Sequence, residues 1–248
     1  MQDLKISLIT VSFNAENTIN RCIQSVLSQT FKNIEYIVID GGSTDKTVSV
    51  IERYKPYLTH LISEPDNGIY DAMNKGIRLA QGHIIGMLNA DDYFADETIL
   101  STIAGVFKKN TIDIVYGDLD YINKSGKVIR RWRSGEVSLI NFNLGWMPAH
   151  PTFYCKRYFF EKFGSYSLHY GTAADYELML RFLYTHKLQA TYINKVIIKM
   201  ENGGKSNRSL NNRVKGLFND LKAMKHNGIP LPYVTLILKP ILKLNQYF

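Results

Sequence analysis

Residues 6–30 read ISLITVSFNAENTINRCIQSVLSQT, and this stretch decides the fold class. It opens with ISLITV (6–11), a mainly apolar run of the length of a strand. From residue 17 to residue 30, apolar residues recur at the spacing of one helix face, at Ile19, Ile23, Val26 and Leu27. A strand followed directly by an amphipathic helix is the first half of a β-α-β unit, which predicts an α/β protein.

The same alternation continues along the chain to residue 109. Further strands are predicted at 36–40, 60–63 and 83–88, and further helices at 43–54, 69–80 and 96–109. Strands that are apolar on both faces are typical of a parallel sheet covered by helices. We therefore predict a Rossmann-like, mostly parallel sheet flanked by helices.

The pattern changes after residue 110. A hairpin is predicted over 113–134, followed by a strand-like PTFYCKR, a helix over 172–186, a strand over 190–200 and two helices divided at Pro230 and Pro232. We expect one domain over residues 1–205 and a C-terminal helical tail over 206–248. The tail is expected to pack on the domain or on a membrane surface.

Composition indicates an intracellular globular protein. The chain has 248 residues, 45% of them hydrophobic, which is enough for a sizeable core. Cys22 and Cys155 have no partners at metal-ligand spacing, so we expect no zinc site or disulfide framework and a reduced, cytoplasmic compartment. The N-terminus lacks the pattern of a signal peptide, and NGIPLPYVTLIL is too short to span a bilayer.

The net charge of +8 is unevenly distributed. Residues 1–125 hold 11 Lys and Arg against 16 Asp and Glu, or −5, whereas residues 126–248 hold 19 against 6, or +13. No helix-turn-helix, zinc-finger or ribonucleoprotein pattern accompanies the basic half, so no nucleic-acid partner is expected. An anionic membrane surface or a phosphate-bearing substrate suits this charge better.

The run GMLNADD (86–92) ends a predicted strand on two adjacent aspartates. In an open parallel sheet the ligand lies beyond the carboxyl ends of the strands, where Thr10 to Glu16, Asp40 and Asp91-Asp92 are all expected. Adjacent carboxylates repel unless a cation lies nearby, and a divalent metal bridging to a diphosphate would supply it. The alternative is a turn and a helix N-cap. A dinucleotide-binding domain is not indicated, because SFNAEN contains no glycine.

Five ordered motifs carry a family resemblance: VSFNAENTI, IDGGSTDKT, EPDNGIYDAMNKGI, LNADD and AADYELMLRF. At these spacings the chain resembles the inverting family 2 glycosyltransferases of the GT-A fold, over roughly residues 4 to 205. EPDNGIYDAMNKGI resembles in particular bacterial members that build O-antigen, capsule and other surface polysaccharides. The resemblance implies an enzyme that transfers a hexosyl or N-acetylhexosaminyl group from a nucleotide-sugar donor, usually UDP-linked, to a hydroxyl of a saccharide acceptor. We expect that acceptor to be linked to a lipid pyrophosphate.

The same resemblance assigns the donor side of the site. It places the base and ribose against the segment from Thr10 to Glu16, with Asp40 accepting the uracil imide hydrogen bond. Metal binding falls to Asp91 and Asp92, with Asp92 as the more direct ligand of Mn²⁺ or Mg²⁺, although Asn89 stands where many members have an aspartate. The complete set of expected donor-binding residues is Thr10, Ser12, Phe13, Asn14, Glu16, Asp40, Gly68, Asn74, Lys75 and Asp91.

The acceptor side rests on fewer motifs. The resemblance makes Asp175 the catalytic base, and the alternatives are a helix capping box beginning at Thr172 and the rival carboxylate Glu177, which is spaced for an ion pair with Arg181. His150 is a candidate for contact with the acceptor or the donor phosphates. Lys205 and Arg208, in MENGGKSNRS, are candidates for a loop that closes over a diphosphate.

Three readings stay open from the sequence. In the helix predicted after Pro230, an apolar face flanked by Lys239 and Lys243 and interrupted by Pro240 suggests contact with the cytoplasmic leaflet, and packing on the domain or a homodimer is the alternative. A catalytically idle member that binds saccharide or a partner enzyme is a second class of function. A nucleotidyltransferase is disfavoured, because the loop after the first strand is neither glycine-rich nor basic.

Overall fold

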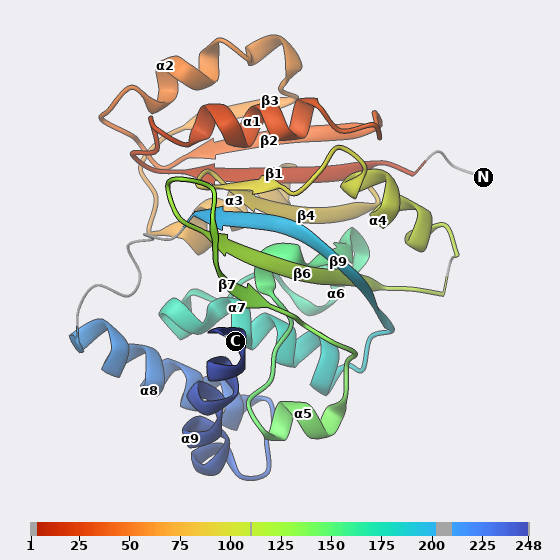
Figure 1. Cartoon of the computed structure of the whole chain (residues 1–248), viewed down its shortest axis with the longest axis vertical. Helices are drawn as coiled ribbons and strands as arrows, with labels where there is room; N and C mark the ends of the chain where they lie inside the picture. Colours follow the sequence, from red (N-terminus) through yellow and green to blue (C-terminus); the bar gives the residue numbers. More distant parts are fainter. Residues whose placement is uncertain (1–3, 110, 202–209, 248) are drawn as a thin grey trace.

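The computed structural model describes residues 4–109, 111–201 and 210–247, and its centre is one nine-stranded mixed sheet. Strands follow the order β3-β2-β1-β4-β8-β6-β9-β5, and β7 pairs with β6 (Figure 1). Their bounds are β1 Ile6–Ser12, β2 Ile34–Asp40, β3 His60–Ser63, β4 Ile84–Asn89, β5 Asp92–Phe94, β6 Ile114–Ile122, β7 Val128–Trp132, β8 Tyr154–Lys156 and β9 Ala190–Glu201. Strands β1 to β4 are mutually parallel, as predicted.

Helices cover both faces of this sheet. The N-terminal helices are α1 Ile19–Leu27, α2 Thr47–Glu52, α3 Ile69–Leu79 and α4 Ile99–Phe107. Neighbouring strand residues point to opposite faces, and β1 demonstrates this. Ile9 packs against Gly76 of α3, where an added Cβ would lie 2.4 Å from Ile9 Cγ2, whereas the Thr10 hydroxyl lies 3.9 Å from the Cys22 sulfur of α1.

The second half contains elements that the sequence did not predict. These are β5, which begins directly at Asp92, and the short helices α5 Leu139–Asn143 and α6 Arg157–Phe163. The predicted helix over 172–186 is divided into a 3-10 turn (Leu168–Ala173), α7 (Ala174–Met179) and a π-helical turn (Leu180–Thr185). Each element is short, so it shows too few periods for a pattern in the sequence.

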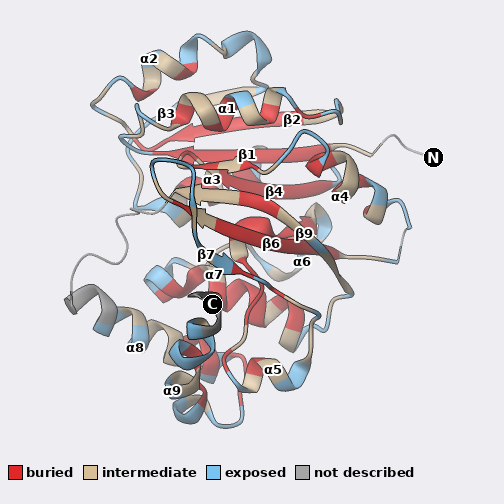
Figure 2. Ribbon diagram, in the orientation of Figure 1, coloured by how far each residue is buried: buried red, intermediate tan, exposed pale blue. Residues whose placement is uncertain are grey.

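The C-terminal helices are α8 Leu210–His226 and α9 Pro232–Leu242, and both pack on the domain. Ala223, Met224 and Ile229 belong to the hydrophobic core, and the Thr235 hydroxyl donates to the Asn143 carbonyl of α5 at 2.6 Å. Contrary to prediction, Pro240 lies inside α9 without ending it. No helix among the described residues is long and apolar enough to cross a membrane. In Figure 2 most of the sheet is buried, whereas α8 and α9 have exposed residues along their described length.

Candidate active site

The loops after β1 and β2 are joined by hydrogen bonds at the carboxyl edge of the sheet. Asn14, which has a positive φ of 49°, donates its N–H to Ser43 Oγ at 2.8 Å and accepts from the Thr44 N–H at 2.9 Å. Glu16 accepts from the Lys46 N–H at 3.0 Å. Two predicted donor-binding residues therefore shape the rim of the crevice by holding two loops together.

Three other predicted donor-binding residues, Thr10, Ser12 and Phe13, lie in β1 or directly after it and differ in exposure. The side chain of Phe13 is 54% exposed, as expected for a surface that receives a base. Thr10, by contrast, is fully buried, and its hydroxyl lies 3.1 Å from that of Tyr36. The expectation that Thr10 faces the nucleotide is therefore wrong, because its position in β1 points it into the core. Ser12 is 5% exposed and donates to Asp40 Oδ1 at 2.9 Å.

Asp40 ends β2 as a fully buried carboxylate. Its oxygens accept hydrogen bonds from the hydroxyls of Ser12, Ser43 and Ser63 and from the N–H groups of Gly42 and Ser43, at 2.5 to 3.1 Å. Such a saturated carboxylate holds the turn at the end of β2, a structural role that aspartate often has in turns. The uracil of a donor could hydrogen-bond to Asp40 only by replacing one of these bonds.

Asp66 is a carboxylate that the sequence reasoning missed. It follows β3, and its Oδ2 would lie 2.3 Å from a Cβ placed on Gly41, so Gly41 is required to make room for it. Its Oδ1 accepts from the Gly68 N–H at 2.8 Å. Gly68 has φ 104° and open space on its side-chain side, as expected where a ligand approaches the backbone. The glycine pair 41–42 and the EPDNG motif were visible signals, but their contact required the fold.

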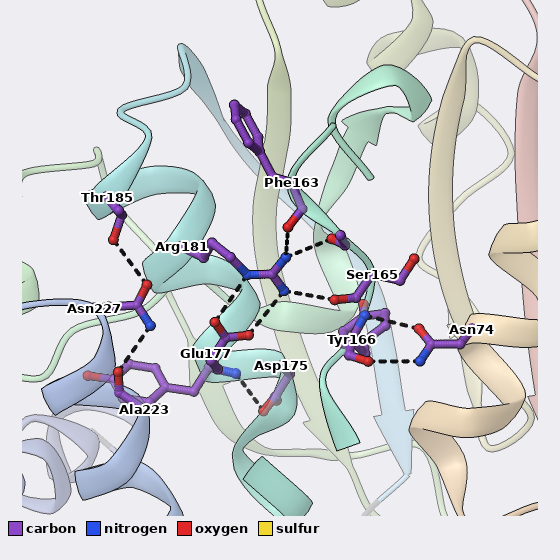
Figure 3. A network of polar contacts seen from close by, with 12 residues as sticks. Asn74, Phe163, Ser165, Tyr166, Asp175, Glu177, Arg181, Thr185, Ala223 and Asn227 are labelled. Atoms are coloured by element: carbon purple, nitrogen blue, oxygen red, sulfur yellow. Dashed lines mark hydrogen bonds and ion pairs between the residues drawn. The ribbon is translucent and has the colours of Figure 1, made fainter. Parts of the chain in front are cut away.

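Asn74 and Lys75 of α3 are occupied within the protein. The Asn74 amide exchanges hydrogen bonds with the backbone of Tyr166, at 2.8 and 3.0 Å (Figure 3). Lys75 pairs with Glu64 at 2.8 Å and donates to the Pro65 carbonyl at 3.0 Å. Lys75 thus fixes the loop after β3, a role that the sequence did not indicate.

The aspartate pair divides into a partly exposed and a buried member. Asp92 is 1% exposed, so the carboxylate that the resemblance made the more direct metal ligand is the less accessible of the two. Its Oδ2 accepts from Asn89 Nδ2 at 3.2 Å, while its Oδ1 and Asn89 Oδ1 have no hydrogen-bond partner among the described residues. Burial and the neighbouring Asp91 charge raise the pKa of Asp92 well above its usual value. Asp91 is partly exposed, and burial raises its pKa less strongly.

The donor atoms present fit a metal ion held jointly with a substrate. Within the described ranges, no group of three or more His, Cys, Asp or Glu residues is placed to hold a metal alone. Mg²⁺ characteristically binds one or two carboxylates plus substrate phosphates, and Mn²⁺ also prefers oxygen ligands. Asp91 offers a partly exposed carboxylate, and its neighbour Asp92 and Asn89 each have one side-chain oxygen without a hydrogen-bond partner among the described residues. Arg21, which pairs with Glu201 at 2.6 Å, supplies nearby positive charge.

Asp175 lies at the same carboxyl edge, facing His150. Their Oδ2 and Nδ1 atoms are 3.2 Å apart, and Asp175 Oδ1 accepts from the Tyr176 N–H at 2.7 Å. Asp175 also raises the pKa of Tyr70, next to the N-terminus of α3, although burial is the larger cause. Burial lowers the pKa of His150, against the opposing effect of Asp175, so the imidazole is neutral at pH 7. The capping box does not form, since α7 has no side-chain cap.

The rival carboxylate Glu177 has a structural role. It is 2% exposed and forms the predicted ion pair with Arg181, with N–O distances of 3.0 and 3.1 Å (Figure 3). Arg181 also donates to the carbonyls of residues 163–165, so its fork holds the end of α6. The other two candidates, Lys205 and Arg208, lie outside the described residues.

Comparisons with known proteins agree with this architecture. A family model described as glycosyl transferase family 2 matches residues 7–174. A PGL/p-HBAD biosynthesis glycosyltransferase of Mycobacterium bovis is 31% identical over 206 residues, which are 81% of this chain and 78% of that protein. Chondroitin synthase of Pasteurella multocida is 32% identical over 127 residues, 50% of this chain and 13% of the synthase.

Solved structures share the fold at low sequence identity. S. aureus TarS 1-349 in complex with UDP-GlcNAc superposes with a TM-score of 0.69 at 15% identity, covering 99% of this chain and 93% of that one. The chain covers 40% of a longer TarS chain. The mannosyltransferase PcManGT of Pyrobaculum calidifontis, in complex with GDP-Man and Mn²⁺, gives 0.66 at 16% identity, covering 94% and 69%. The chain is therefore a glycosyltransferase of family 2 with the GT-A fold.

Proposed function

We propose that this glycosyltransferase moves a sugar from a UDP-linked donor to a hydroxyl of a saccharide acceptor, with inversion at the anomeric carbon. The observation that carries the mechanism is the placement of Asp175, with neutral His150 against one oxygen, at the edge where the strands end. An inverting displacement needs a base on the acceptor side, opposite the leaving diphosphate. UDP and UDP-GlcNAc in complexes of the structural neighbour TarS support the choice of donor.

In this mechanism, the acceptor hydroxyl attacks the anomeric carbon while Asp175 Oδ2 takes its proton. The bond from the anomeric carbon to the diphosphate oxygen breaks, and that oxygen leaves with the electron pair. The Tyr176 N–H bond to Asp175 Oδ1 keeps the carboxylate fixed and leaves Oδ2 for the proton. His150, whose Nδ1 lies 3.2 Å from that oxygen, would act as a positioning residue by packing against the carboxylate.

On the donor side, Phe13 offers an apolar surface to the base, and the Gly68 backbone allows close approach. Asp66 is the carboxylate available to an imide N–H, since the oxygens of Asp40 are already bonded. We propose that Asp91 is the direct ligand of a Mn²⁺ or Mg²⁺ ion, backed by Asp92. The ion would supply Lewis-acid stabilisation of the diphosphate.

We propose that the acceptor is a surface-polysaccharide precursor linked to a lipid diphosphate at the inner face of the membrane. Leu231, Tyr233, Val234, Ile237 and Ile241 expose 48 to 67% of their surface on and beside α9. Lys239 does not join this surface, contrary to the sequence expectation, because it is 5% exposed and pairs with Asp220 at 2.8 Å. An exposed apolar helix face suits peripheral contact with a membrane surface.

The deciding assay incubates purified protein with a panel of nucleotide sugars, with Mn²⁺ or with excess EDTA, and measures release of the nucleoside diphosphate. We expect release from one UDP-sugar that depends on the metal and rises when a lipid-diphosphate saccharide is added. Absence of release from every donor would support an idle, binding-only member.

A further inference from the structure

A cavity of about 280 Å³ lies between β7 and the C-terminal end of the chain. At about 30 Å³ for each water, this volume equals that of about nine water molecules, which leaves room for a small anion such as a diphosphate. The 3-10 turn Lys243–Tyr247, at the end of the described chain, packs on β7 (Figure 1). Its charged and aromatic lining consists of Arg131, Arg133, Lys239, Lys243, Trp132 and Trp146.

The charge of this lining is entirely positive, and half of it is already compensated. Arg133 pairs with Asp120 at 2.8 Å and Asp118 at 3.6 Å, and Lys239 pairs with Asp220. Neither Arg131 nor Lys243 has an ion-pair partner in the part of the chain that the structure describes. Two cations therefore remain available to an anion that enters the cavity.

Lys239 makes the cavity a built site. Its side chain is almost fully buried, and its ammonium lies 3.3 Å from the centroid of the Tyr176 ring. Burial lowers its pKa to about 8, with Asp220 opposing and Lys243 adding to the shift. Lys239 is paired with Asp220 but is still repelled by Lys243, and an anion bound beside Lys243 offsets this repulsion.

The cavity adjoins the proposed base. Trp132 lines it and packs edge-on against the His150 ring, with centroids 5.9 Å apart, and His150 faces Asp175. On its other side, Leu242 lines the cavity and is 38% exposed, next to the exposed apolar face of α9. The cavity therefore has the proposed base near one side and the exposed apolar face of α9 near the other.

We propose that this cavity binds the diphosphate of a lipid-linked acceptor, with Arg131 and Lys243 as its principal contacts and Trp132 separating it from the base. The proposal rests on the proposed function, since it names the part of the acceptor that the enzyme grips. The saccharide then extends past Trp132 toward Asp175, and the lipid chain lies along α9.

Both tryptophans of the chain line the cavity, so intrinsic fluorescence reports on it directly. The experiment titrates inorganic pyrophosphate, farnesyl diphosphate and phosphatidylglycerol vesicles in separate arms. Each arm contains EDTA and saturating UDP, which block metal-dependent binding at the donor site. We expect a saturable fluorescence change with both diphosphates, at lower concentration for farnesyl diphosphate.

The variants are Arg131→Ala and Lys243→Ala, and the matched controls replace two exposed residues, Arg78→Ala on α3 and Lys108→Ala at the C-cap of α4. Each cavity variant should weaken diphosphate binding at least tenfold, as expected for loss of a charge-assisted contact, while the controls bind as wild type. Thermal melting checks that every variant is folded.

Equal affinity in the cavity variants and the wild type overturns the proposal, as does a signal produced by vesicles alone. Donor hydrolysis by the wild type is measured in parallel. Hydrolysis without diphosphate binding would refute the cavity and leave the proposed function standing. Diphosphate binding without hydrolysis of any donor would refute the proposed function.

Discussion

Replacing Asp92 with asparagine should stabilise the metal-free protein. Asp92 is 1% exposed, one of its oxygens has no hydrogen-bond partner, and its neighbour Asp91 carries the same charge. Leaving a buried polar group unsatisfied costs about 1–3 kcal/mol, and more for a charged group. In Asp92→Asn the charge disappears, and the new amide N–H group can donate to the unpartnered Asn89 Oδ1. We expect a gain of about 1–3 kcal/mol, or about 2–12 °C in Tm for a chain of this length.

The measurement is urea unfolding at pH 7 in EDTA, repeated with Mn²⁺ and UDP. The wild type should gain about 2.7 kcal/mol at a ligand concentration of 100 times Kd, and the variant less, because it lacks a carboxylate beside the metal. The advantage of the variant in EDTA should shrink as pH falls. Since the folded-state pKa of Asp92 is raised, the wild type binds a proton there and loses the penalty of a buried charge.

The matched control is Asp96→Asn, which should lower the free energy of unfolding, whereas Asp92→Asn should raise it. Burial is the largest single influence and raises the pKa of Asp96, but hydrogen bonds from Lys195 and Thr98 together outweigh it and hold the pKa at about 2. Asp96 is largely exposed, so its removal should cost less than about 1 kcal/mol. If Asp92→Asn has a lower free energy of unfolding than the wild type in EDTA, the buried Asp92 carboxylate does not destabilise the metal-free protein, and the reasoning is refuted.

Four further substitutions test the remaining assignments. Asp175→Asn should lower the transfer rate about 10²–10⁴-fold with UDP affinity nearly unchanged, and a near-normal rate would exclude Asp175 as the base. Glu177→Gln should chiefly lower the free energy of unfolding, by about 3–5 kcal/mol, because it leaves the Arg181 charge without its carboxylate partner. Protonation of His150 would draw Asp175 into an ion pair, and burial lowers the His150 pKa, so the wild-type rate should fall only below about pH 6.5. His150→Gln should move this fall to lower pH, and an unchanged pH profile of kcat/KM would contradict the contact. Ile237→Glu should weaken sedimentation with phosphatidylglycerol vesicles without changing Tm, and undiminished binding would remove the membrane role of α9.

Much of the first half of the fold could be predicted from the sequence, because its strands and helices are long enough to show their periods. The site edge was likewise predictable, since Asp40 and Asp91 follow strands that end at one side of a parallel sheet. The ion pair of Glu177 with Arg181 followed from helical spacing alone and is confirmed. The short elements β5, α5 and α6 were not predicted from the sequence. For β5 the reason is visible, because this strand pairs with β9, which is far away in the chain.

The sequence by itself determined the fold class, the family motifs and the edge of the sheet where a ligand would lie, because these depend on local periodicity and chain order. Only the tertiary structure decided which polar groups remain available. It buried Thr10 and Asp92, saturated Asp40 with hydrogen bonds, and placed Asp66 against Gly41 and His150 against Asp175. These contacts join segments far apart in the chain, and their burial depends on packing that no local pattern encodes.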